Sequence, residues 1–136
     1  SPLAHGILRE KTSQLNWIVD SAGTSAFHEG EGPDPRSVAT ARKHKLNIRD
    51  LEARQFEVDD FDNFDLIYAM DQSNFANICA LARNEQDIEK VKLILNEVNG
   101  KSNAEVPDPY YGGEHGFENV YQILDEATDI IVKKYG

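Results

Sequence analysis

The sequence has 136 residues, 40% of them hydrophobic, which fits a single domain over residues 1–136 with a core of its own. Its formal net charge of −10 argues against sequence-independent binding to nucleic acid or to an anionic membrane, so a phosphate-bearing ligand would need a local positive site. Cys79 is the only cysteine, which excludes an internal disulfide; with no apolar run near 20 residues and no signal-peptide pattern, we expect a cytoplasmic protein.

The first third of the chain predicts a helix, a strand and a second helix. Ser1-Pro2 provides a helix cap followed by proline at the first helical position. Trp17–Asp20 is a short apolar run that ends in the loop Ser21–Thr24, a pattern typical of a buried strand. Asp34-Pro35 then starts a second helix, which we expect to end near Leu46-Asn47.

The remaining chain continues the alternation of strands and helices. Asp65–Met70 is the clearest strand, and Asp71–Leu81 has the pattern of a capped helix. Val91–Leu95 predicts another strand, and the polar stretch Asn96–Glu105 predicts a surface loop. Phe117–Tyr135 carries the apolar periodicity of a long amphipathic helix.

This order indicates an α/β fold with a doubly wound parallel sheet covered by helices on both faces. Ligands of such sheets bind outside the carboxyl ends of the strands. Only three strands are visible, however, and no strand precedes the first helix. Because that strand would be central in a doubly wound sheet, we expect a strand of about five or six residues, with its following loop, to be absent from residues 1–136.

The loop Val106–Gly113 has the composition of half of an active site. Asp108 lies between two prolines, which restrict the backbone and hold the carboxyl at a fixed angle, as suits a general acid. Asp-Pro and Gly-Gly pairs are also typical of a simple turn. Tyr110 and Tyr111 could form aromatic walls for a flat ring, although loop tyrosines often only pack on the surface.

The other reactive side chains favour structural roles. A phosphate-attacking thiolate is usually followed six positions later by an arginine, but position 85 is Glu85. Cys79 also lies in an apolar helical stretch, so we expect it to be a packing residue. The Asp59–Asp62 run predicts a helix start with a solvated face. We assign no metal, because metal-ligand spacing is absent from the four histidines, His5, His28, His44 and His115.

Five blocks stand in one order along nearly the whole chain: Asp20–Thr24, Pro33–Ser37, Ala53–Gln55, Ala69–Asn74 and Asp108–Gly113. Together they resemble the low-molecular-weight protein tyrosine phosphatases. The resemblance implies a three-layer fold with a four-stranded parallel sheet, a cytoplasmic location, no cofactor, and a monomer or weak dimer. It also implies two-step hydrolysis of phosphotyrosine proteins or aryl phosphates through a phosphocysteine.

The resemblance also implies roles for the second half of the site. Asp108 matches the general acid that protonates the leaving tyrosine oxygen and then activates water. Tyr110 and Tyr111 match the aromatic wall of the substrate cleft. Phe27 matches the aromatic side chain that faces this wall, and His28 falls where residue choice tunes substrate preference.

The first half of the site departs from the family. Ser21 matches a serine that helps to hold the phosphate-binding loop, and Ser1 matches the hydroxyl that steadies the departing thiolate. The family signature is Cys-x5-Arg-Ser-Pro, and residues 1–136 begin at its Ser-Pro. Nucleophile and phosphate-clamping arginine are therefore both missing, and we expect residues 1–136 to be inactive.

Three interpretations of this departure stay open. The sequence can be an incomplete record of an ordinary phosphatase, whose Asp108 loop and aromatic residues are intact. It can be a non-catalytic fragment that binds a partner, or that folds when a strand is supplied in trans. It can also be related to thiol-dependent arsenate reductases, but these need further cysteines, and Cys79 alone cannot relay a disulfide.

Overall fold

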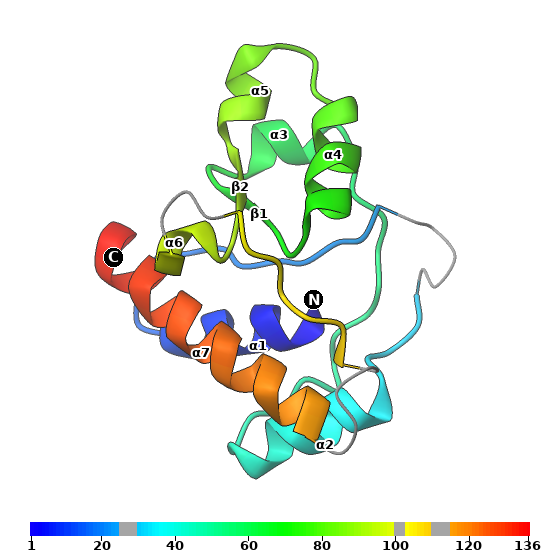
Figure 1. Ribbon diagram of the computed structural model, residues 1–136, viewed down its shortest axis with the longest axis vertical. Coiled ribbons are helices and arrows are strands. Elements are labelled where there is room, and N and C mark those ends of the chain that lie inside the picture. Colours follow the sequence, from blue (N-terminus) through cyan, green and yellow to red (C-terminus); the bar gives the residue numbers. More distant parts are fainter. Residues whose placement is uncertain (25–29, 100–102, 110–114) are drawn as a thin grey trace.

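The computed structural model describes residues 1–24, 30–99, 103–109 and 115–136 and has a mixed arrangement of helices and parallel strands (Figure 1). Two three-residue strands, β1 and β2, pair in parallel with Ile67 opposite Val91. The α/β class and the parallel sheet are therefore confirmed. The elements in chain order are α1 (Pro2–Lys11), α2 (Pro35–Lys43), α3 (Asp60–Asn63), β1 (Ile67–Ala69), α4 (Gln72–Ala80), α5 (Glu85–Glu89), β2 (Val91–Leu93), α6 (Asn96–Asn99) and α7 (Gly116–Tyr135).

Side-chain caps start three of the helices where the sequence predicts them. Ser1 Oγ accepts a hydrogen bond from the backbone N–H of Ala4 at 3.3 Å, at the start of α1. Asp34 caps α2 in the same way, and Asp71 caps α4 through the N–H of Asn74 at 2.7 Å. Each cap satisfies a backbone donor that has no partner within the helix.

Helix α2 ends earlier than the predicted end near Leu46-Asn47. Its last residue is Lys43, and Lys45 adopts a positive φ of 64°. The N–H of Leu46 then donates to the carbonyl of Ala41 at 2.9 Å, which closes the helix in a Schellman motif. No glycine stands at this position to signal the end of the helix, so the apolar pattern predicts a longer one.

The predicted strand Trp17–Asp20 is wrong. Within the described residues no strand lies beside this segment, and Ile18 is 85% exposed. A strand forms only where a neighbouring strand pairs with its amides and carbonyls. Pairing begins later, at an isolated parallel bridge between Gly23 and Gln55, where the Gly23 N–H donates to the Arg54 carbonyl at 2.9 Å.

Two other predictions need correction. The predicted loop Asn96–Glu105 begins with the short helix α6, which follows directly after β2 and its turn. Asp60 does not lie on a solvated face, because it is only 6% exposed, and its carboxylate is ion-paired with Arg54. Burial of Phe61 beside it draws this part of α3 into the interior.

The buried side chains form two clusters. The helical core joins α1, α2 and α7, whereas the sheet core joins β1 and β2 to α3 and α4, which lie at the other end of the molecule (Figure 1). The helical core contains Leu3, Ala4, Ile7, Ala41, Ile48, Leu51, Ile94, Leu95, Val120, Tyr121, Leu124, Ala127 and Ile131, and the sheet core contains Phe56, Phe61, Ala69, Ile78, Val91 and Leu93.

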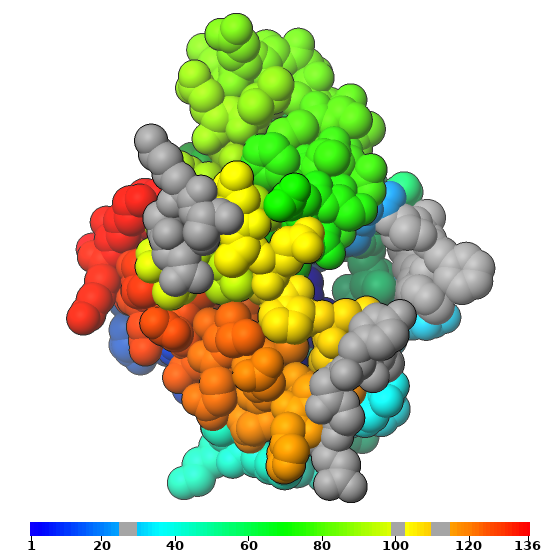
Figure 2. Space-filling view, viewed as in Figure 1, coloured from blue at the N-terminus to red at the C-terminus, as the bar shows by residue number. Residues whose placement is uncertain are grey.

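Residues 103–109 cross the surface between α4 and the first turns of α7 (yellow in Figure 2). The N–H of Val106 donates to the carbonyl of Met70 at 2.9 Å, just after β1 ends. The backbone N–H of Gln72 donates to the Glu105 carboxylate at 2.7 Å. These bonds fix the segment at the carboxyl end of the sheet. Among the described helices, none combines the length and the apolar character needed to cross a membrane.

Candidate functional site

A cavity of about 320 Å³ lies between the two cores. Its walls come from α1, from the segment Trp17–Thr24, from β1 and from α4. In β1, Ile67 donates its N–H to Lys90 and Ala69 accepts from Ile94, so both residues turn their polar backbone groups toward β2. The backbone groups of Tyr68 therefore point to the other edge of the strand, where the cavity lies.

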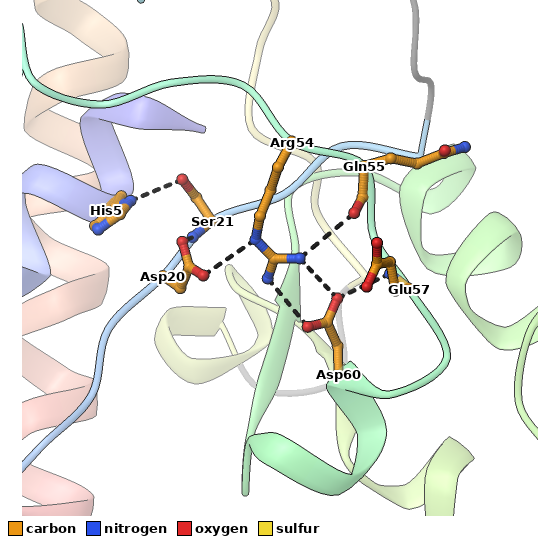
Figure 3. A network of polar contacts seen from close by, with 7 residues as sticks. All are labelled: His5, Asp20, Ser21, Arg54, Gln55, Glu57 and Asp60. Carbon is orange, nitrogen blue, oxygen red and sulfur yellow. Dashed lines mark hydrogen bonds and ion pairs between the residues drawn. The ribbon is translucent and has the colours of Figure 1, made fainter. Parts of the chain in front are cut away.

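A chain of polar contacts surrounds Ser21 on one wall of this cavity (Figure 3). His5 Nδ1, from α1, lies 2.8 Å from Ser21 Oγ. The backbone N–H of Ser21 donates to the Asp20 carboxylate, also at 2.8 Å. The side chain and the backbone of Ser21 are therefore both fixed, and its hydroxyl can bond to one further group in the cavity.

Arg54 connects this loop to α3. Its Nε donates to Asp20 at 3.0 Å, and its two terminal nitrogens donate to the two oxygens of Asp60 at 3.0 and 3.1 Å (Figure 3). Asp60 also accepts the backbone N–H of Glu57 at 2.8 Å. Burial lowers the pKa of Arg54, but the hydrogen bonds and charges of Asp60 and Asp20 outweigh it and raise that pKa.

The environment of His5 favours its neutral form. Burial lowers the pKa of the imidazole, and the nearby charge of Arg9 acts in the same direction, while Asp20 partly opposes them. In a neutral imidazole with its proton on Nε2, Nδ1 accepts a hydrogen bond from the hydroxyl of Ser21. The lone pairs of Ser21 Oγ are then available to a donor in the cavity.

The structure brings together some of the predicted site residues. Ser1 and Ser21 both line the cavity, although Ser1 Oγ is used as the cap of α1. Asp108 is exposed and lies on the segment fixed at the carboxyl end of β1, but not among the residues that line the cavity. Four predicted residues of the substrate cleft, Phe27, His28, Tyr110 and Tyr111, lie outside the described residues.

Cys79 lies where a packing residue is expected. It is half-buried on α4 and packs against the sheet core, and burial raises the pKa of its thiol. A raised pKa reduces the fraction of thiolate, which is the nucleophilic form. In the described ranges, no cluster of three or more His, Cys, Asp or Glu side chains is arranged to hold a metal ion.

Sequence reasoning missed the residues that hold Ser21. His5 was considered only as a metal ligand, although it lies four positions after Ser1 and therefore on the same helical face. Arg54 lies in the block Ala53–Gln55, one of the five that carry the family resemblance, and received no role of its own. Asp20 and Asp60 are separated by 40 positions in the sequence, and only the fold reveals that one guanidinium binds both.

Comparisons with known proteins agree on one family. The sequence profile described as "Low molecular weight phosphotyrosine protein phosphatase" matches residues 1–134. A Synechocystis protein named "Putative low molecular weight protein-tyrosine-phosphatase" is 39% identical, over 100% of this chain and 88% of the relative. A protein tyrosine phosphatase structure from Entamoeba histolytica has a TM-score of 0.88 at 33% identity, covering 98% of this chain and 87% of the other. A Drosophila arginine phosphatase structure has a TM-score of 0.88 at 28% identity, covering 99% of this chain and 89% of the other.

Proposed function

Because this chain belongs to the low molecular weight phosphotyrosine protein phosphatase family, we propose that it takes part in the hydrolysis of phosphotyrosine in proteins, with Asp108 as the general acid. The observation that carries the proposal is the anchored segment before Asp108. The bond from Val106 to the carbonyl of Met70 fixes this segment at the carboxyl end of β1, where ligands of parallel sheets bind.

The proposed mechanism has two steps. A cysteine thiolate attacks phosphorus and displaces the tyrosine oxygen, which takes a proton from Asp108 as it leaves. The Asp108 carboxylate then removes a proton from water, which attacks the phosphocysteine and releases inorganic phosphate and the thiolate. Ser21, held by His5, supports the phosphate-binding loop by accepting a hydrogen bond from that loop. Tyr110, Tyr111 and Phe27 enclose the aromatic ring.

We assign the nucleophile to a segment outside residues 1–136. Cys79 is the only cysteine in the sequence, and its half-buried thiol packs against the sheet core. Burial raises the pKa of that thiol, which is opposite to what a phosphate-attacking cysteine needs. Residues 1–136 alone are therefore expected to leave aryl phosphates intact.

A chimera tests this proposal directly. A segment with the family signature Cys-x5-Arg, taken from the Synechocystis relative, is joined to Ser1, and hydrolysis of p-nitrophenyl phosphate is measured. We expect turnover by the chimera, none by residues 1–136, and none when the added cysteine is replaced by serine. Asp108→Asn in the chimera should lower turnover by roughly 10²–10⁴-fold with little change in substrate binding.

Other outcomes would reject parts of the proposal. Undiminished turnover in the Asp108→Asn chimera would remove Asp108 from the mechanism. Turnover by residues 1–136 that disappears in Cys79→Ser would assign the nucleophile to Cys79. Because one structural neighbour is an arginine phosphatase, a phosphoarginine peptide is assayed beside the phosphotyrosine peptide. Faster hydrolysis of phosphoarginine would overturn the proposed substrate.

The cavity favours a second candidate, a module that binds an extended strand. The backbone groups of Tyr68 on one wall and the unpaired segment Trp17–Asp20 on another could pair with an inserted parallel strand. A synthetic apolar peptide with the sequence of the first strand of the Synechocystis relative is added to residues 1–136. A rise in the unfolding temperature that a scrambled peptide does not produce would support this candidate, and equal effects of both peptides would reject it.

A further inference from the structure

One segment of this acidic protein is strongly basic. The sequence has 24 acidic and 14 basic residues, yet residues 35–49 contain five Lys and Arg residues and no Asp or Glu. The segment comprises α2, its closing turn and the residues up to Arg49. In Figures 1 and 2, α2 forms the lower end of the molecule. The negative net charge of the chain is therefore not uniform over its surface.

Two side chains in this segment already have acidic partners. Arg36 pairs with Asp34 at 3.2 Å, and His44 Nε2 lies 2.8 Å from the Glu118 carboxylate. In contrast, among the described residues no carboxylate lies within ion-pair distance of Arg42 or Arg49. Both side chains are exposed, so their guanidinium groups can bind a partner without breaking an existing ion pair.

Arg42 and Arg49 line the same hollow, an open depression of about 440 Å³. Its other lining residues are small or apolar: Gly32, Pro33, Pro35, Val38 and Ala39. We call this the Arg42–Arg49 hollow. An apolar floor with two guanidinium groups suits an extended peptide, because the peptide can cover the prolines while its carboxylates form paired hydrogen bonds with the arginines.

In the sequence, the lining of the hollow begins close to one of the segments that carry the proposed substrate cleft. Its first lining residue, Gly32, lies four positions after His28 in the sequence. Arg36, on the first turn of α2, lies with its guanidinium carbon 5.0 Å from the centroid of the Phe117 ring, at the start of α7. In the sequence, Tyr110 and Tyr111 precede α7 by a few positions.

We propose that the Arg42–Arg49 hollow binds an acidic stretch of the protein substrate, beside its phosphotyrosine. The substrate identity rests on the proposed function, but the recognition of carboxylates rests only on the geometry and charge of the hollow. Two local positive charges are needed here, because the net charge of −10 would otherwise repel an acidic substrate. Such contacts select substrates and speed their encounter with the site.

Fluorescence anisotropy with labelled peptides tests the proposal on residues 1–136 as they exist. One peptide carries phosphotyrosine followed by a run of glutamates, a second replaces the glutamates by glutamines, and a third replaces phosphotyrosine by tyrosine. We expect the glutamate peptides to bind more tightly than the glutamine peptide. Their affinity should fall as salt is raised to roughly 0.15 M, because both arginines are exposed.

The double variant Arg42→Gln/Arg49→Gln should bind the glutamate peptides about five- to tenfold more weakly, the loss expected for two exposed charge pairs. Lys133→Gln/Lys134→Gln is the control, because it removes the same charge at the last turn of α7, distant from α2 in Figure 1. It should change the affinity by less than about twofold. Arg42→Lys/Arg49→Lys should bind the glutamate peptides more tightly than the glutamine double variant but more weakly than the parent, since lysine lacks the paired donors.

Equal losses in the two glutamine variants would overturn the proposal, since only overall charge would then matter. Equal binding of the glutamate and glutamine peptides would also overturn it. Tighter binding to phosphatidylserine vesicles than to the peptide, lost in the Arg42 and Arg49 variant, would assign the hollow to a membrane surface instead. The proposed function is tested separately in the chimera with its added cysteine replaced by serine, which carries the phosphate-binding loop. If the phosphatase function is wrong, phosphotyrosine adds nothing to binding by this chimera, but the effect of Arg42 and Arg49 on the glutamate peptides persists.

Discussion

At the scale of single residues, His5 joins α1 to the Ser21 loop through one hydrogen bond of 2.8 Å. Charged side chains act on its imidazole in both directions: Asp20 and Asp50 raise its pKa, while Arg9 lowers it. Burial is the largest influence and makes the net shift downward. The folded protein therefore binds a proton at His5 less readily than the unfolded chain does.

This shift predicts a pH-dependent stability. In the unfolded chain, histidine takes up a proton as the pH falls through about 6.5. Folded His5 is still neutral at that pH, so proton uptake by the unfolded chain favours unfolding. Stability should be complete above about pH 6.5 and fall as the pH drops toward the lower pKa of folded His5. His5→Gln should abolish this part of the loss, because glutamine does not titrate. The measurement is urea unfolding of both proteins between about pH 7.5 and pH 5.

Carboxylates supply a built-in comparison at lower pH. The hydrogen bond from Arg9 lowers the pKa of Asp50, so its stabilising effect is lost only as the pH falls below the ordinary aspartate range. The parent protein and His5→Gln should lose the same amount of stability in that acidic range. A fall in stability between pH 7.5 and 5 that is the same in His5→Gln would show that another group carries it.

At the scale of elements, the start of α7 depends on a glycine. A Cβ on Gly116 would collide with the carbonyl oxygen of Pro109, so Gly116→Ala must displace either the first turn of α7 or the segment that holds Asp108. Overpacking of this kind costs about 1–3 kcal/mol of unfolding free energy. Gly32→Ala is the matched control, since a Cβ there meets nothing within 4 Å.

Urea unfolding measures both alanine variants. Gly32→Ala should leave stability within about 0.5 kcal/mol of the parent or raise it slightly, because alanine restricts the unfolded chain. In the chimera, Gly116→Ala should also lower turnover if the displaced segment is the one with Asp108. A Gly116→Ala protein as stable as the control would mean that the close approach to Pro109 is relieved at no cost.

The elements also explain which parts of the fold were predictable. Helix starts at Ser1, Asp34 and Asp71 were predicted because a cap is a contact between residues two or three positions apart. The prediction of a strand at Trp17–Asp20 failed, because a strand needs a neighbouring strand to pair with, and sequence periodicity does not show whether one is present. The end of α2 was missed since Lys45, not glycine, adopts the positive φ.

The candidate site was predictable to a similar extent. Asp108 could be selected from its two flanking prolines, and its place at the carboxyl end of a strand follows from the α/β order. The contacts among His5, Asp20, Arg54 and Asp60 could not be predicted. The longest of them joins residues 34 positions apart, and each of these residue types occurs many times on ordinary surfaces.

At the scale of the whole molecule, the cavity separates two hydrophobic clusters, and Arg54 bridges them beside it. Asp20 belongs to the wall next to α1, whereas Asp60 belongs to α3 and the sheet core. The Asp60 side chain is 8% exposed and that of Arg54 is 31% exposed, so this ion pair is shielded from solvent far more than that of Arg9 and Asp50, at 41% and 61%. Contacts across the cavity should therefore couple the two clusters, so that they unfold together.

Arg54→Met should lower stability by roughly 2–3 kcal/mol, because it leaves the buried Asp60 carboxylate with only the backbone N–H of Glu57. Arg9→Met, which breaks an exposed pair with Asp50, should cost less than about 1 kcal/mol. Trp17, the only tryptophan, lies on the cavity wall and reports on the helical side, while circular dichroism reports on all helices. In Arg54→Met, tryptophan fluorescence and circular dichroism should no longer share one urea midpoint. Coincident midpoints, together with a loss of stability no greater than in Arg9→Met, would show that Arg54 does not couple the two cores.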